Sequence, residues 1–126
     1  MGNKGSFEDL VVWQKAHNFV LSVYKVTASF PKEELFGLTS QFRRAAVSIA
    51  ANIAEGYKKK GVKDKLRFYN TSQGSMEECK YYLILSQDLN YAKTDSLRAD
   101  IDEIGKMLES YMNAMCKNND LGNSNS

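Results

Sequence analysis

Residues 95–116 read DSLRADIDEIGKMLESYMNAMC. Their apolar side chains recur at alternating steps of four and three residues, at Leu97, Ile101, Ile104, Leu108, Tyr111 and Met115. Because an α-helix turns once every 3.6 residues, this spacing places all six on one side of a helix. The stretch therefore predicts a helix that packs this side against neighbouring helices.

Three further segments show helical spacing, and each is followed by helix-breaking residues. They are residues 6–30, which precede Pro31, residues 38–59, and residues 62–89. Eight glycines and one proline are few breakers for 126 residues, so long helices are favoured over strands and turns. Since short connections make each helix antiparallel to the one before, the sequence predicts an all-α, up-down-up-down four-helix bundle.

The chain is expected to form a single domain, because 126 residues with 43% apolar side chains suffice for one core. We assign residues 1–117 to the bundle and expect the polar C-terminal tail, residues 118–126, to be disordered. No export signal opens the sequence, and its longest uncharged stretch, residues 45–54, is too short to span a bilayer. We therefore expect a cytoplasmic protein that does not bind membranes.

The first helical segment has apolar side chains around most of its circumference. One seam contains Leu10, Trp13, Val20 and Tyr24, and the adjacent seam contains Val12, Ala16, Phe19, Val23, Val26 and Phe30. A helix in a small monomer needs an apolar stripe only about 100° wide. The surplus predicts an oligomer in which the second seam forms the subunit contact. The alternative is that the linker and the tail of the same chain cover this seam.

A second candidate for the subunit contact is polar. Three- and four-residue steps align Gln41, Arg44, Ser48, Asn52 and Glu55 beside a row of small residues. Such a stripe is either an ordinary solvated face or a contact between subunits. The small residues favour the contact, to which we assign Arg44 and Asn52.

The sequence lacks the residue sets of common catalytic and metal sites. His17 is the only histidine and lies on an apolar seam, and neither Glu-x-x-His nor a glycine-rich phosphate-binding motif occurs. We therefore expect no enzymatic activity, no metal and no cofactor. The remaining alternative is a hydrolase that uses Glu55 or Glu77.

Positive charge is concentrated in residues 58–67, which we call the basic window. Six cations stand there against Asp64 alone, namely Lys58, Lys59, Lys60, Lys63, Lys65 and Arg67. The window carries +5, so the rest of the chain carries −3 of the total of +2. Lys63 and Lys65 fall in the first turn of a helix, where the helix dipole disfavours cations.

This placement leaves two explanations for the basic window, solubility and a site for phosphates, of which we favour the second. Among the aromatic residues beside it, Phe68 falls on the core stripe of residues 62–89, so Tyr57 is the better candidate for stacking on bases. The window and Tyr57 together predict a nucleic-acid-binding site.

Several blocks of the sequence together resemble one known family. They are FEDL (7–10) with WQKA (13–16), FPKEE (30–34) with GL (37–38), QFRRAAVSI (41–49), NIAEG (52–56) and GSMEE (74–78). Over about residues 7–91 the chain is similar to the bacterial four-helix bundle family first described from proteins encoded in intervening sequences of ribosomal RNA genes. More distantly similar is the accessory protein of diversity-generating retroelements, a basic pentameric bundle that binds nucleic acid and a reverse transcriptase.

The resemblance implies a left-handed bundle that assembles as a ring-shaped homopentamer, with no established catalytic activity. The family's Arg-Arg pair, Asn-x-x-Glu-Gly motif and Ser-x-Glu segment fall on Arg43 and Arg44, on Asn52, Glu55 and Gly56, and on Ser75 and Glu77. The resemblance does not establish what these residues do. Five copies of the basic window in one ring would carry about +25, a charge that favours polyanions.

The resulting hypothesis is a non-enzymatic homo-oligomer that binds RNA or single-stranded nucleic acid at its basic end. The alternative is a scaffold or accessory subunit that binds a partner protein and does not contact nucleic acid.

Overall fold

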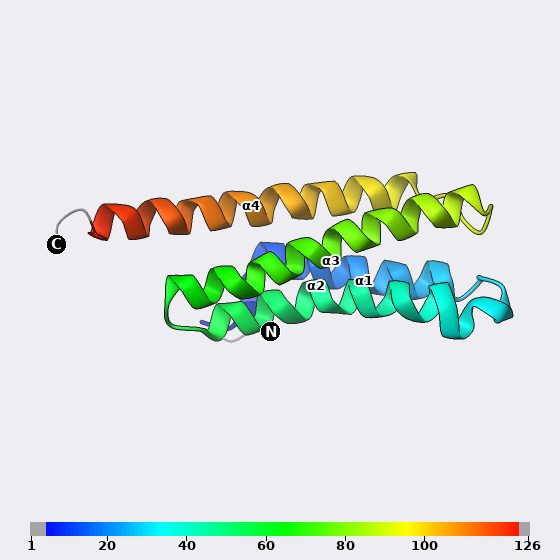
Figure 1. Cartoon of the computed structure of the whole chain (residues 1–126), viewed down its shortest axis with the longest axis horizontal. Coiled ribbons are helices and arrows are strands. Elements are labelled where there is room, and N and C mark those ends of the chain that lie inside the picture. The colour runs from blue at the N-terminus through cyan, green and yellow to red at the C-terminus, as the bar shows by residue number, and fades with distance from the viewer. Residues whose placement is uncertain (1–4, 124–126) are drawn as a thin grey trace.

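The computed structural model describes residues 5–123, and it confirms the predicted bundle of four helices that run alternately up and down (Figure 1). The helices are α1 (Val11–Thr27), α2 (Ser40–Lys58), α3 (Val62–Asp88) and α4 (Asp95–Asn123), and no strand occurs between residues 5 and 123. α2 and α3 are the most closely associated pair, and α4 packs against α1 and α3. The α2–α3 connection lies at one end of the bundle, which we call the basic pole (Figure 1).

The first helix is shorter than predicted at both ends. Ser6 caps a short 3₁₀ turn, Phe7–Asp9, and α1 begins only after it. At the other end the chain leaves the helix in tight turns after Thr27, ahead of the predicted end at Phe30. Phe30 precedes Pro31, and a residue before proline is disfavoured in the helical conformation.

The connection between α1 and α2 consists of a 3₁₀ turn, Lys32–Glu34, and a π-helical turn, Leu35–Thr39. The π-helical turn is kinked at Gly37. This path leaves the side chain of Phe36 93% exposed. An apolar tip therefore lies at the pole opposite the basic window.

α4 is longer than predicted. It continues to Asn123, so the predicted helix end near Cys116 is wrong. The reason is that no proline or glycine interrupts the chain between Cys116 and Gly122. The predicted tail, residues 118–126, thus overlaps α4, and its residues 124–126 lie outside the described part of the chain.

The core of the single chain contains most of the seam that we assigned to a subunit contact. Four of those residues are at most 5% exposed, namely Val12, Ala16, Phe19 and Val23. Because buried side chains offer no surface to a second copy, this assignment is corrected, and these are core residues. Val26 is half-buried and packs against the same core. The large apolar side chains of α1 that are exposed are instead Val11, at its start, and Leu21 and Tyr24, further along the helix.

The α2–α3 pair is held close by small residues next to the basic window. A methyl group on Gly56 would lie 2.6 Å from Cε1 of Tyr69, which is fully buried, so only glycine fits between them. The buried hydroxyl of Ser72 on α3 donates a hydrogen bond to the backbone carbonyl of Ile49 on α2 (2.9 Å). These contacts fix the position of the α2–α3 connection.

Candidate nucleic-acid interface

The basic window forms the end of α2, the connection and the first turns of α3. The backbone is extended at Lys59 and at Gly61, and α3 then begins at Val62. Gly61 has no side chain that could cap the helix, so the first N–H groups of α3 are left to solvent or a ligand. The positive end of the α3 dipole therefore adds to the charge of the lysines at this pole.

Three lysines of the window have no partner among the side chains that the structure describes. The side chains of Lys58, Lys60 and Lys63 are exposed. Among the side chains of residues 5–118, which the structure describes, none of them forms an ion pair or a side-chain hydrogen bond. Their charge is available to an external anion.

Lys65 has a different role from the one predicted. Its Nζ donates hydrogen bonds to the backbone carbonyls of Tyr57 (2.6 Å) and Gly56 (3.3 Å) at the end of α2. The side chain is half-buried, and this burial lowers the pKa of the Lys65 ammonium. Lys65 therefore caps α2 across the turn. The dipole of α3 disfavours a cation in its first turn, and this contact with α2 explains why Lys65 nevertheless stands there. We therefore remove Lys65 from the binding residues.

Two other cations of the window lie around Phe68. The Nζ of Lys59 is 4.9 Å from the centre of the Phe68 ring, and the guanidinium carbon of Arg67 is 5.1 Å from it. Phe68 is half-buried, so it lies at the edge of the core rather than inside it. Arg67 also pairs with Asp64 (3.3 Å) on the exposed side of α3.

Tyr57, the predicted stacking residue, is less suited to that role than Phe68. Tyr57 is half-buried, and the Nζ of Lys65 lies over its ring at 5.4 Å from the ring centre. Because Lys65 is itself held by carbonyls of α2, this ring is engaged within the protein. The sequence analysis assigned Phe68 to the core because its spacing matches the core stripe of residues 62–89.

The two arginines of the Arg-Arg pair have separate environments. Arg43 connects α2 to α1, since its Nε donates to the hydroxyl of Thr27 (2.8 Å) and its guanidinium lies 4.7 Å from the ring centre of Tyr24. Arg44 is exposed, and within the described residues it forms no ion pair. Arg43 is thus structural, and Arg44 remains available for an intermolecular contact.

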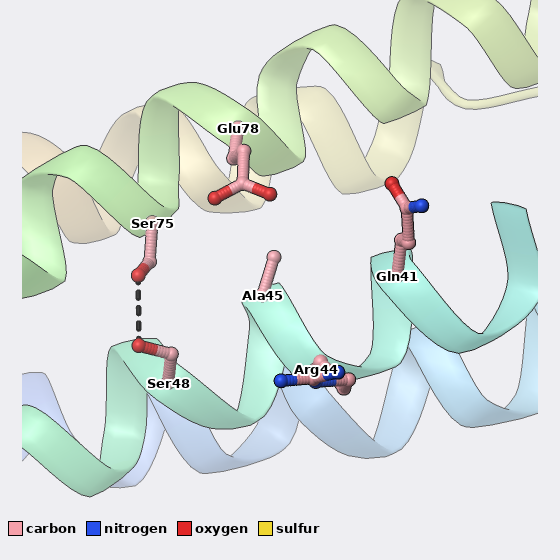
Figure 2. Close-up of a pocket in the computed structure, with 6 residues that line it drawn as sticks. All are labelled: Gln41, Arg44, Ala45, Ser48, Ser75 and Glu78. Atoms are coloured by element: carbon pink, nitrogen blue, oxygen red, sulfur yellow. Dashed lines mark hydrogen bonds between the residues drawn. The ribbon is translucent and has the colours of Figure 1, made fainter. Parts of the chain in front are cut away.

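Arg44 borders a shallow groove of about 360 Å³ between α2 and α3. Figure 2 shows its lining, with Gln41, Arg44, Ala45 and Ser48 from α2 and with Ser75 and Glu78 from α3. The hydroxyls of Ser75 and Ser48 are hydrogen-bonded across it (2.8 Å). Asn52, which we assigned to a subunit contact, is half-buried and donates to the backbone carbonyl of Ser48 (2.8 Å), one turn earlier in α2. Its amide nitrogen is therefore already bonded within α2.

The residues named for the hydrolase alternative do not form a catalytic arrangement. Glu77 pairs with Lys80 (3.0 Å) on the surface of α3, and Glu55 is exposed on α2. His17 is exposed and stacks on Trp13 with 5.1 Å between the ring centres. In the part of the chain that the structure describes, no three His, Cys, Asp or Glu side chains are grouped as a metal site would require. None of the described helices combines the length and apolar character of a membrane span.

Comparison with known proteins agrees with the resemblance seen in the sequence. A crystal structure of a protein of unknown function from the S23 ribosomal protein family of Bacteroides thetaiotaomicron matches with a TM-score of 0.73 and 27% identity, over 81% of this chain and 98% of that one. No match was found among curated proteins. The family model described as 23S rRNA-intervening sequence protein matches residues 8–110. Since this match covers most of the bundle, the chain belongs to the 23S rRNA-intervening sequence protein family.

Proposed function

We propose that this protein is a non-enzymatic homo-oligomer that binds RNA or single-stranded nucleic acid through the phosphates, using its basic pole. The observation that carries the proposal is the set of exposed ammonium groups of Lys58, Lys60 and Lys63, which have no partner among the described side chains and lie beside the uncapped start of α3. Lys65 adds to this arrangement by neutralising the negative end of α2. The proposed binding residues are these three lysines with Lys59, Arg67 and Phe68.

The homo-oligomer is supported by an apolar surface that α1 and α2 leave uncovered. Leu21 and Tyr24 of α1 and Val47 of α2 are 54%, 44% and 40% exposed. The two helices share this side, because Arg43 of α2 lies over the Tyr24 ring. Arg44 is exposed one turn of α2 away from Val47. We propose that this surface, rather than the buried seam, forms the subunit contact of a ring of five copies.

Nucleic-acid binding is tested by titrating a labelled oligouridine with the protein at several salt concentrations. Release of counterions by about five cations predicts a slope of log affinity against log salt of about −3.5, or about a hundredfold loss between about 50 and 200 mM salt. The double variant Lys59→Glu with Lys63→Glu is expected to abolish binding.

The matched control is Lys32→Glu with Lys93→Glu. These exposed lysines lie in the connections at the opposite pole, and the double variant changes the net charge by the same amount. It is expected to retain most of the affinity. Absence of binding at low salt, or equal losses in the two double variants, contradicts a site at the basic pole.

The oligomer is tested by light scattering of the purified protein. We expect a mass of about five times 14.2 kDa for the native chain, and a mass near that of one chain for Leu21→Asp with Val47→Asp. Ile84→Asp, which places a carboxylate on the exposed surface of α3, is expected to leave the assembly intact. A single-chain mass for the native protein contradicts the oligomer.

The second candidate is a scaffold or accessory subunit that binds a partner protein without contacting nucleic acid. The observation that favours it is the apolar tip at Phe36, 93% exposed beside Leu35, which is 50% exposed. Large apolar groups this exposed are typical of protein contacts. This candidate is preferred if oligouridine does not bind.

A further inference from the structure

Phe68 and its two cations differ from the other charged groups of the basic pole, because an aromatic ring lies between them. Lys59 comes from the α2–α3 connection and Arg67 from the first turns of α3, and both approach the Phe68 ring within about 5 Å of its centre. Attraction between a cation and a ring at this distance orients the cations relative to the ring. Phosphate-binding groups and a stacking surface are therefore held together at one place.

Contact with α2 anchors the base of the Phe68 side chain. A methyl group on Gly56 would lie 3.1 Å from the Cβ of Phe68, so this part of the side chain packs directly against the α2 backbone. The residue as a whole is only half-buried. The side chain is thus anchored at its Cβ and partly exposed, with Lys59 and Arg67 beside its ring.

Arg67 extends this surface outward. Its side chain is 69% exposed, and a guanidinium that lies over a ring can itself stack on a nucleic-acid base. Asp64 is the carboxylate beside this surface, and it accepts a hydrogen bond from Arg67 at 3.3 Å. Its negative charge would repel an incoming phosphate. The Asp64 side chain is 60% exposed, so its pairing with Arg67 is a weak one.

We infer that Phe68 and Arg67 together form a stacking site for one unpaired base of single-stranded nucleic acid, with Lys59 on a neighbouring phosphate. This inference rests on the proposed function and makes it more specific. The bases of a duplex stack on one another and leave no free face, so the site selects single strands. Selection is by the unpaired face of a base and not by sequence.

The experiment compares a strand that has bases with one that has none. The probes are an oligothymidine of about ten nucleotides and an abasic deoxyribose-phosphate strand of the same length, which carries the same phosphates. We expect the native protein to bind oligothymidine about tenfold more tightly than the abasic strand. Phe68→Leu is expected to remove this difference by weakening only the binding of oligothymidine.

A second variant is needed because Phe68→Leu could disturb the folding of the bundle. Arg67→Lys retains the charge and loses the planar guanidinium, so it is expected to weaken oligothymidine binding while leaving the abasic strand unaffected. Equal, salt-dependent affinity of the native protein for both strands overturns the stacking site and leaves phosphate binding intact. Binding of neither strand overturns the proposed function as well. If both variants weaken the two strands equally, the side chains act only on the structure or charge of the pole, and the inference fails.

Discussion

The ammonium group of Lys65 lies 2.6 Å from the backbone carbonyl oxygen of Tyr57, so a side chain from the start of α3 caps the end of α2. Lys65→Met keeps most of the aliphatic stem and removes this bond and the one to Gly56. Because Lys65 is only half-buried, we expect a loss of about 1 kcal/mol in the free energy of unfolding, measured by urea denaturation.

Lys63→Met is the matched control for this prediction. Lys63 is exposed two residues away and has no side-chain partner within the described residues. Its removal is expected to leave stability within about 0.5 kcal/mol of the native value and to weaken oligouridine binding. If Lys65→Met is as stable as the native chain, the capping role is wrong.

Gly56→Ala is expected to destabilise the bundle. The added methyl group would lie 2.6 Å from the ring of Tyr69, which is fully buried and cannot move without displacing other core groups. Overpacking of this kind costs about 1–3 kcal/mol, which thermal unfolding followed by circular dichroism would detect.

Gly74→Ala tests whether the Gly56 effect is specific. Gly74 is exposed within α3, and apart from the adjacent residues and the backbone of its own helix nothing lies within 4 Å of an added methyl group. Since alanine is the better helix former, Gly74→Ala is expected to stabilise the protein by about 0.5–1 kcal/mol. Equal effects of the two substitutions would contradict the close α2–α3 contact.

Arg43 and Arg44 are expected to respond differently to substitution by alanine. Arg43→Ala removes the bond to Thr27 and the contact with the Tyr24 ring that join α1 to α2, at a cost of about 1–2 kcal/mol in urea denaturation. Arg44→Ala is expected to leave the stability of the single chain unchanged and to reduce the oligomeric mass. A large loss of stability from Arg44→Ala alone would contradict this assignment.

The fold could be predicted from the sequence because its determinants are local. The seam of residues 97–115 requires only helical geometry, and Pro31 and Gly61 mark connections near those observed. The fate of the α1 seams could not be predicted. Periodicity reports which residues share a side of a helix, but not which side the other three helices cover. Val12 and Leu21 are both apolar, and only the packing of α1 separates a buried side chain from one that is 54% exposed.

The candidate site was predicted in part for the same reason. The concentration of lysines is a property of composition, and Lys58, Lys60 and Lys63 are exposed as a binding site requires. The roles of Lys65 and Phe68 depend on contacts across the α2–α3 turn, eight or nine residues apart in the case of Lys65. Helical spacing within α3 carries no information about these contacts. It therefore led to the prediction that Lys65 binds the ligand and that Phe68 belongs to the core.

Alkaline pH is expected to destabilise the protein. Burial raises the pKa of the Cys79 thiol and of the Tyr82 hydroxyl to about 12 in each case, and burial also raises the pKa of Tyr69. The unfolded chain loses these protons at lower pH, near 9 to 10, so the stabilisation present below about pH 9 is lost as the pH rises toward about 12. Urea denaturation at a series of pH values measures the decline, and Cys79→Ala is expected to make it shallower. Stability that stays constant up to about pH 11 contradicts the burial of these groups.

Asp64→Asn is expected to strengthen nucleic-acid binding. Asp64 is the only carboxylate in the basic window, and its pairing with Arg67 competes with phosphate for the guanidinium. Its removal raises the local charge by one unit, so we expect about a two- to fivefold gain in affinity for oligouridine at low salt, measured by fluorescence anisotropy. The gain should shrink as salt is added. Glu33→Asn removes an exposed carboxylate at the opposite pole and changes the net charge equally, so it should leave affinity nearly unchanged. If both substitutions strengthen binding equally, nucleic acid responds to the net charge of the protein and not to the arrangement of side chains at the basic pole.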